Sequence, residues 1–148
     1  MNPLLLLADA LVLLHWLVVL FVVLSPFAFA CGALLDRRGT PARSKLARYL
    51  VRAKRSPRWR IAHLLTLAWI VVNTWLGKLC FLTIWEFALR DAAGQIVTEQ
   101  GFIARWLAQA LYIEAPWWAF VAAYSVFFAL VLLTLWWAPP DWRARPRR

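Results

Sequence analysis

The sequence predicts an all-α integral membrane protein with three transmembrane helices, a basic cytoplasmic amphipathic helix and a short external interfacial helix. Hydrophobic residues make up 64% of its 148 residues and charged residues 16%, whereas soluble domains are about half apolar and about a quarter charged. Apolar stretches at 4–35, 61–85 and 116–138 each exceed the roughly 20 residues that a bilayer requires. Nearly all basic residues lie outside these stretches.

The first stretch, 4–35, carries a single charged residue, Asp9. No lysine or arginine precedes Arg37, so the positively charged start of a signal peptide is missing and a transmembrane helix is favoured. Ser25-Pro26 predicts a kink near the cytoplasmic end of this helix.

The following segment, 36–60, contains ten basic residues and one acidic residue, a net charge of +9. Thr40 and Pro41 suit the start of a helix. Apolar side chains then recur at helical spacing, and basic side chains cover the opposite face. We expect these basic residues to contact the headgroups of an anionic inner leaflet: Lys45, Arg48, Arg52 and Arg55. Such a helix is either a topology anchor or a docking surface for a partner or a specific lipid.

The second stretch, 61–85, contains one lysine, Lys78. The external segment that follows, 86–115, has a net charge of −2 from two basic and four acidic residues. Gly94 is a typical helix terminator, and an apolar stripe from Phe102 to Tyr112 predicts a short helix in the outer interface.

The third stretch, 116–138, has no charged residue and carries a tryptophan pair at each end. The matching members are separated by nineteen residues, or about 28 Å in a helix, which matches the hydrocarbon thickness. The tail, 139–148, has a net charge of +3. The positive-inside rule therefore predicts an external N-terminus and a cytoplasmic C-terminus.

Polar residues inside the apolar stretches are the main candidates for function, because they are costly in a bilayer. They form a predicted intramembrane cluster of Asp9, His15, Asn73, Lys78 and Cys80. Asp9 and Lys78 have similar depths and either form an ion pair or reach the interface separately. His15 and Asn73 are expected to share an interhelical hydrogen bond.

A haem b held by His15 and His63 is the alternative use of the two histidines. Counted from the external ends of their helices, they differ in depth by about 13 Å, which argues against one shared iron. A haem on one histidine, or a quinone, remains as the redox alternative. We predict no metal site, no cofactor and no catalytic residue, and Cys31 and Cys80 lie too far apart for a disulfide.

The sequence resembles the small bacterial inner-membrane proteins of domain-of-unknown-function family 2784. The similar segments are Leu7–His15, Trp59–Leu64, Gly77–Gly94, Gly101–Ile103 and Leu111-Tyr112. Phe81, Lys78 and the long basic loop depart from that pattern. The resemblance implies that these residues belong to a shared pattern: Asp9, His15, His63, Cys80, Glu86 and Arg90. Their positions along the chain place Arg60 and His63 at the inner interface. Glu86 and Arg90 are expected at a helix end near Asp9, at the outer face, and their spacing is that of a helical pair.

Small size, eleven tryptophans and no complete catalytic set predict a non-enzymatic accessory or scaffolding subunit of a membrane complex. The alternatives are a haem- or quinone-binding redox component and a small oligomeric transporter or channel. The expected partners are the anionic bilayer and a membrane protein or further copies of the chain. The net charge of +10 belongs to membrane topology rather than to nucleic-acid binding.

Overall fold

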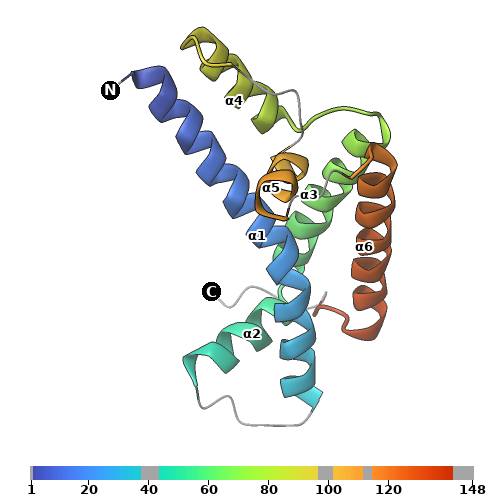
Figure 1. Cartoon of the computed structure of the whole chain (residues 1–148). Coiled ribbons are helices and arrows are strands. Elements are labelled where there is room, and N and C mark those ends of the chain that lie inside the picture. Colours follow the sequence, from blue (N-terminus) through green and yellow to red (C-terminus); the bar gives the residue numbers. More distant parts are fainter. Residues whose placement is uncertain (1, 38–43, 97–101, 112–114, 142–148) are drawn as a thin grey trace. The chain divides into compact units, whose positions relative to one another are not determined.

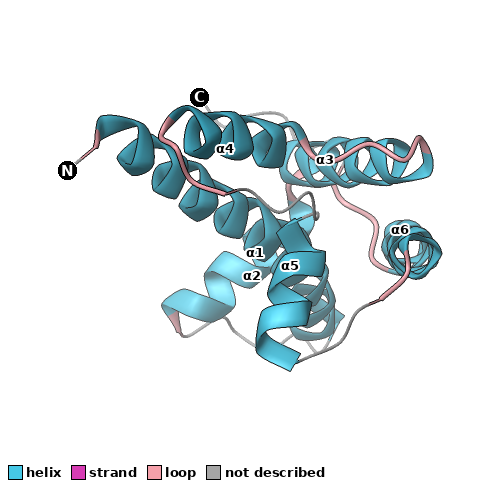
Figure 2. Ribbon diagram, turned by 45° about the horizontal axis from the view of Figure 1, so that its top comes forward, coloured by secondary structure: helices cyan, strands magenta, loops and turns pink. Residues whose placement is uncertain are grey.

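The computed structural model describes residues 2–37, 44–96, 102–111 and 115–141. Every regular element among these residues is a helix, as Figure 2 shows in cyan. The six helices are labelled in Figure 1: α1 Pro3–Arg37, α2 Lys45–Arg55, α3 Pro57–Trp75, α4 Phe81–Ala92, α5 Phe102–Leu111 and α6 Trp117–Trp137. The predicted all-α class is therefore confirmed.

The chain divides into two compact units. The first unit comprises Met1–Val19 and Ile70–Ser125, and the second comprises Leu20–Trp69 and Val126–Arg148. The boundary falls within α1, α3 and α6, so each unit is described by itself.

Two helices, α1 and α6, are long and apolar enough to cross a membrane. In α6 the only buried residue is Val131, and its large apolar side chains include Trp136, which is 87% exposed. A helix that is apolar on all sides and uncovered by its own chain is typical of a membrane span.

The predicted span at 61–85 is wrong as a single helix, because α3 ends at Trp75 and α4 begins at Phe81. Gly77 adopts a φ of 67°, which side chains with a Cβ rarely adopt. Its N–H donates to the Thr74 carbonyl at 3.1 Å, and the Lys78 N–H donates to the Asn73 carbonyl at 2.9 Å. These two bonds satisfy carbonyls at the helix end and stop α3. With Arg58 and Arg60 in its first turn, α3 does not reach the apolarity of a span.

The other helix ends follow local capping chemistry. Ser44 Oγ accepts a hydrogen bond from the Ala47 N–H at 3.1 Å and caps α2. The predicted cap, Thr40, and Pro41 lie outside the described residues. Gly94, with a φ of 77°, terminates α4 as expected.

The short α5 coincides with the predicted interfacial helix, except that Tyr112 lies outside the described residues. Phe102, its first residue, is buried. The start of α5 therefore packs in the interior of the first unit.

Candidate functional site

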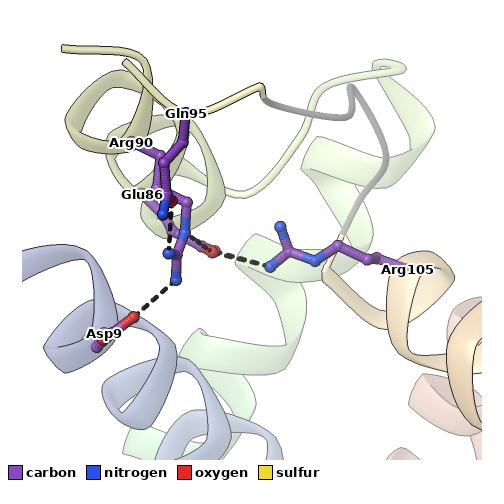
Figure 3. Close-up of polar contacts among 5 residues, drawn as sticks. All are labelled: Asp9, Glu86, Arg90, Gln95 and Arg105. Atoms are coloured by element: carbon purple, nitrogen blue, oxygen red, sulfur yellow. Dashed lines mark hydrogen bonds and ion pairs between the residues drawn. The ribbon is translucent and has the colours of Figure 1, made fainter. Parts of the chain in front are cut away.

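The first unit contains a network of four charged side chains that joins α1, α4 and α5 (Figure 3). Arg90 Nη2 donates to Asp9 Oδ1 at 2.9 Å, and Arg90 Nε donates to Glu86 Oε1 at 3.0 Å. Arg105 Nη2 donates to both carboxylate oxygens of Glu86, at 3.0 and 2.9 Å. Arg90 Nη1 also donates to Gln95 Oε1 at 3.2 Å. Two carboxylates and two guanidiniums therefore balance one another.

Glu86 is the centre of this network, because its side chain is only 2% exposed. A buried carboxylate is stable only if it is paired and hydrogen-bonded, and Glu86 receives three such bonds from two arginines. Burial lowers the pKa of Arg90, but hydrogen bonds to Glu86 and Asp9 outweigh it and hold that pKa above its ordinary value.

Asp9 pairs with Arg90, so of the two alternatives for Asp9 and Lys78 the ion pair between them does not form. Lys78 is exposed in the segment between α3 and α4. Cys80 is half-buried and occupies the N-cap position of α4 without a side-chain cap bond. Asn73 is half-buried in the last turns of α3.

His15 is buried in the first unit, where its ring stacks on Phe102 with centroids 3.9 Å apart. Trp16 packs edge-on against Phe102 and Trp106. His15 Nδ1 and Thr83 Oγ1 are buried without a hydrogen-bond partner within the described part of the chain. His15 therefore stacks on an aromatic ring of α5, and its expected hydrogen bond to Asn73 stays a prediction.

Sequence reasoning missed Arg105, which closes the network from α5. Glu86 and Arg90 are four residues apart, and this spacing identifies a helical pair. Arg105 lies nineteen residues beyond Glu86, so no periodicity connects the two. The one available signal is that α5 carries a single charge beside an apolar stripe.

In the second unit, His63 repairs a break that Pro26 leaves in α1. Proline has no N–H, so the Val22 carbonyl, four residues earlier, loses its helical donor. His63 Nε2 lies 2.9 Å from this carbonyl oxygen. A carbonyl can only accept, so Nε2 carries the hydrogen and the neutral ring keeps Nδ1 unprotonated. One turn away, Trp59 Nε1 donates to Ser25 Oγ at 3.2 Å.

We expect His63→Phe to lower the free energy of unfolding by about 1–3 kcal/mol, because the buried Val22 carbonyl loses its donor. In a Pro26→Ala background the same change should cost less, since the alanine backbone supplies an N–H to that carbonyl. Apparent melting temperatures of the four proteins in one detergent measure the coupling, expected at about 1 kcal/mol. Strictly additive effects would refute the assignment.

Arg60, one turn before His63 on α3, is 1% exposed. Its Nη1 donates to Thr134 Oγ1 at 3.1 Å, and its Nη2 donates to the Ala138 carbonyl at 2.6 Å. The guanidinium carbon lies 3.9 Å from the centre of the Phe29 ring. No carboxylate pairs with Arg60 among the residues that the structure describes. The partial negative charge at the end of α6 and the Phe29 ring compensate this cation.

The basic residues of α2 fall into two sets. Lys54 Nζ and Arg55 Nη2 bind the Asp36 carboxylate at 3.0 and 2.6 Å, and the hydrogen bond to Asp36 raises the pKa of Arg55. Lys45, Arg48 and Arg52 are exposed. Arg55 was expected to contact lipid headgroups, but it pairs with Asp36 of the protein itself.

The described residues hold no group of three or more His, Cys, Asp or Glu side chains that could bind a metal ion. His63 is fully buried and directs Nε2 at a backbone carbonyl. His15 is also buried, with 8% of its surface exposed.

The fold and these contacts define an all-helical protein with two candidate membrane-spanning helices and a network of ion pairs that joins three of its helices. The chain belongs to the family described as Protein of Unknown function (DUF2784), whose sequence model matches residues 5–140. No curated protein and no solved structure matches the chain.

Proposed function

We propose that this protein is a non-enzymatic accessory or scaffolding subunit of a bacterial inner-membrane complex. The observation that carries the proposal is the contrast between α6 and the charged network. Val131 is the only α6 residue that the chain itself buries, so lipid or another protein must cover the exposed side chains of this helix. The central carboxylate of the network, Glu86, is not free to act as a general base, because two arginines hold both of its oxygens.

The tryptophans of α6 offer a surface to a protein partner as well as to lipid. Trp118 and Trp136 are 71% and 87% exposed. Such rings offer a large apolar area with one hydrogen-bond donor, which suits both a helix interface and the membrane boundary. Catalysis would require a nucleophile or base free to contact a substrate; the buried, paired state of Glu86 does not favour that role.

The proposal keeps a third crossing, by the part of α3 that follows Arg58 and Arg60, with the N-terminus outside and the C-terminus in the cytoplasm. The charge of the connecting segments supports three crossings, because the segment 36–60 has a net charge of +9 and the segment 86–115 a net charge of −2. The strongly basic α2 and the end of α6 belong to the same unit, where Arg37 Nη2 donates to the Trp137 carbonyl at 2.6 Å. That placement agrees with the positive-inside rule.

Co-purification tests the proposal. The tagged protein is extracted from native membranes in a mild detergent, and its companions are quantified by mass spectrometry. We expect one membrane protein at a fixed stoichiometric ratio. As a matched test of the surface, Trp118→Ala and Trp136→Ala should reduce the recovery of that partner, whereas Trp59→Phe, inside the second unit, should leave it unchanged.

A partner-free preparation would contradict the subunit proposal. A visible absorption band in that preparation, lost in His15→Leu, would favour the redox alternative instead. Homo-oligomers with ion flux in vesicles would favour the transporter alternative.

A further inference from the structure

The outward side of α2 is a cluster of basic side chains that the protein itself does not neutralise. Lys45, Arg48 and Arg52 follow one another at i, i+3 and i+7 and lie within roughly 60° of arc, because successive residues of a helix turn by about 100°. All three are exposed, and none takes part in the ion pairs of the described residues. We call these three residues the α2 basic cluster.

The acidic side chains that the structure describes in the second unit pair with basic residues outside the α2 basic cluster. Asp36 is shared by Lys54 and Arg55, and Asp141 lies 3.7 Å from Arg55 Nε. No acidic residue occurs within α2 itself. Like charges three and four residues apart on a helix repel one another. The α2 basic cluster is therefore available to bind anions from outside the chain.

The position of α2 restricts the source of those anions. Its Ala53 is buried, and the Leu50 backbone lies close against Gly32 of α1. Helix α2 thus lies against the last turns of a candidate membrane span, close to where the bilayer would end. Beside the basic cluster, Leu46 and Tyr49 are 66% and 49% exposed. A cationic row next to exposed apolar side chains is the pattern of a helix lying at a membrane surface.

We infer that the α2 basic cluster binds the phosphates of acidic phospholipids in the adjacent leaflet, with Leu46 and Tyr49 entering the boundary between headgroups and acyl chains. Lys54 and Arg55 do not contribute, since Asp36 occupies them. The inference rests on the membrane location given under the proposed function. It adds a lipid class and separates the binding residues from the structural ones.

Native mass spectrometry of the whole protein in detergent, titrated with phosphatidylglycerol or phosphatidylcholine, tests the inference. The wild type should retain phosphatidylglycerol preferentially. Lys45→Gln/Arg48→Gln/Arg52→Gln should weaken this binding on the order of a hundredfold, since each basic residue near an anionic surface contributes about 1 kcal/mol. Its melting temperature should stay unchanged, because the three side chains are exposed.

The control variant Arg143→Gln/Arg145→Gln/Arg147→Gln removes the same number of charges from the C-terminal tail and should bind phosphatidylglycerol close to the wild-type level. Equal binding by wild type and the α2 variant, or equal loss in both variants, would overturn the assignment. Retention of an acidic protein by the wild type but not by the α2 variant would also overturn it and identify a protein partner. If the α2 variant still co-purifies with the same membrane partner, the subunit proposal does not depend on lipid binding by α2.

Discussion

Glu86→Gln is expected to lower the free energy of unfolding by about 3 kcal/mol, the lower part of the range for breaking a buried ion pair. The variant keeps the size of the side chain but removes its charge. Arg105 and Arg90, with side chains 16% and 22% exposed, then lose the carboxylate that neutralises them. The lower part of the range applies because both arginines retain some contact with solvent.

Thermal unfolding in detergent, followed by tryptophan fluorescence, measures this effect. A loss of this size corresponds to roughly 6–12 °C in melting temperature. Asp91→Asn is the matched control, since Asp91 is an exposed carboxylate on the same helix and its loss should change stability by less than about 0.5 kcal/mol. Glu86→Leu/Arg105→Leu should be less destabilising than Glu86→Leu alone, because no unpaired guanidinium remains at α5. Equal melting temperatures for Glu86→Gln and Asp91→Asn would show that the network has no structural role.

Gly32→Val is the second large effect that we expect. A Cβ at this position would lie 2.3 Å from the Leu50 carbonyl oxygen, 2.8 Å from its carbon and 3.0 Å from the Lys54 Cβ. Two of these neighbours are backbone atoms, which cannot rotate away. Helix α2 would have to move off α1, and overpacking of this kind costs about 1–3 kcal/mol. The move would also separate Lys54 and Arg55 from Asp36.

Limited trypsin digestion should detect this displacement, because α2 contains five basic residues and a detached helix is cut faster. We expect faster cleavage between residues 45 and 55 together with a lower melting temperature. Cys31→Ala, at the exposed neighbouring position, should change neither. Cleavage of Gly32→Val at the wild-type rate would mean that α2 does not need the close approach to α1.

Much of the fold could be predicted because it depends on local sequence. Apolar length identified α1 and α6, and the alternation of basic and apolar residues identified α2. Glu86 and Arg90 were recognisable as a pair because helical spacing brings residues four apart together. Gly94 was recognisable as a terminator for the same reason, since its conformational freedom is a property of one residue.

The second apolar stretch was wrongly predicted to be one helix, because a single glycine hardly changes its average apolar composition. The run 61–85 is apolar on average, so its composition predicts one continuous helix. The positive φ of Gly77 ends α3 instead, which places Lys78 in a connecting segment. The pairing of Asp9 with Arg90 depends on this break, because α4 becomes a separate helix that can lie against α1.

The helical class, the two long apolar helices and the location of the basic charge could be read from the sequence alone, because each depends on residues near one another in the chain. Which charges neutralise one another depends on the tertiary structure. Arg105 binds Glu86 from another helix, His63 bonds to a carbonyl that Pro26 leaves free, and Arg60 caps the end of α6. These contacts join residues between nineteen and seventy-eight positions apart. No sequence periodicity encodes such separations; the packing of the helices brings the residues together.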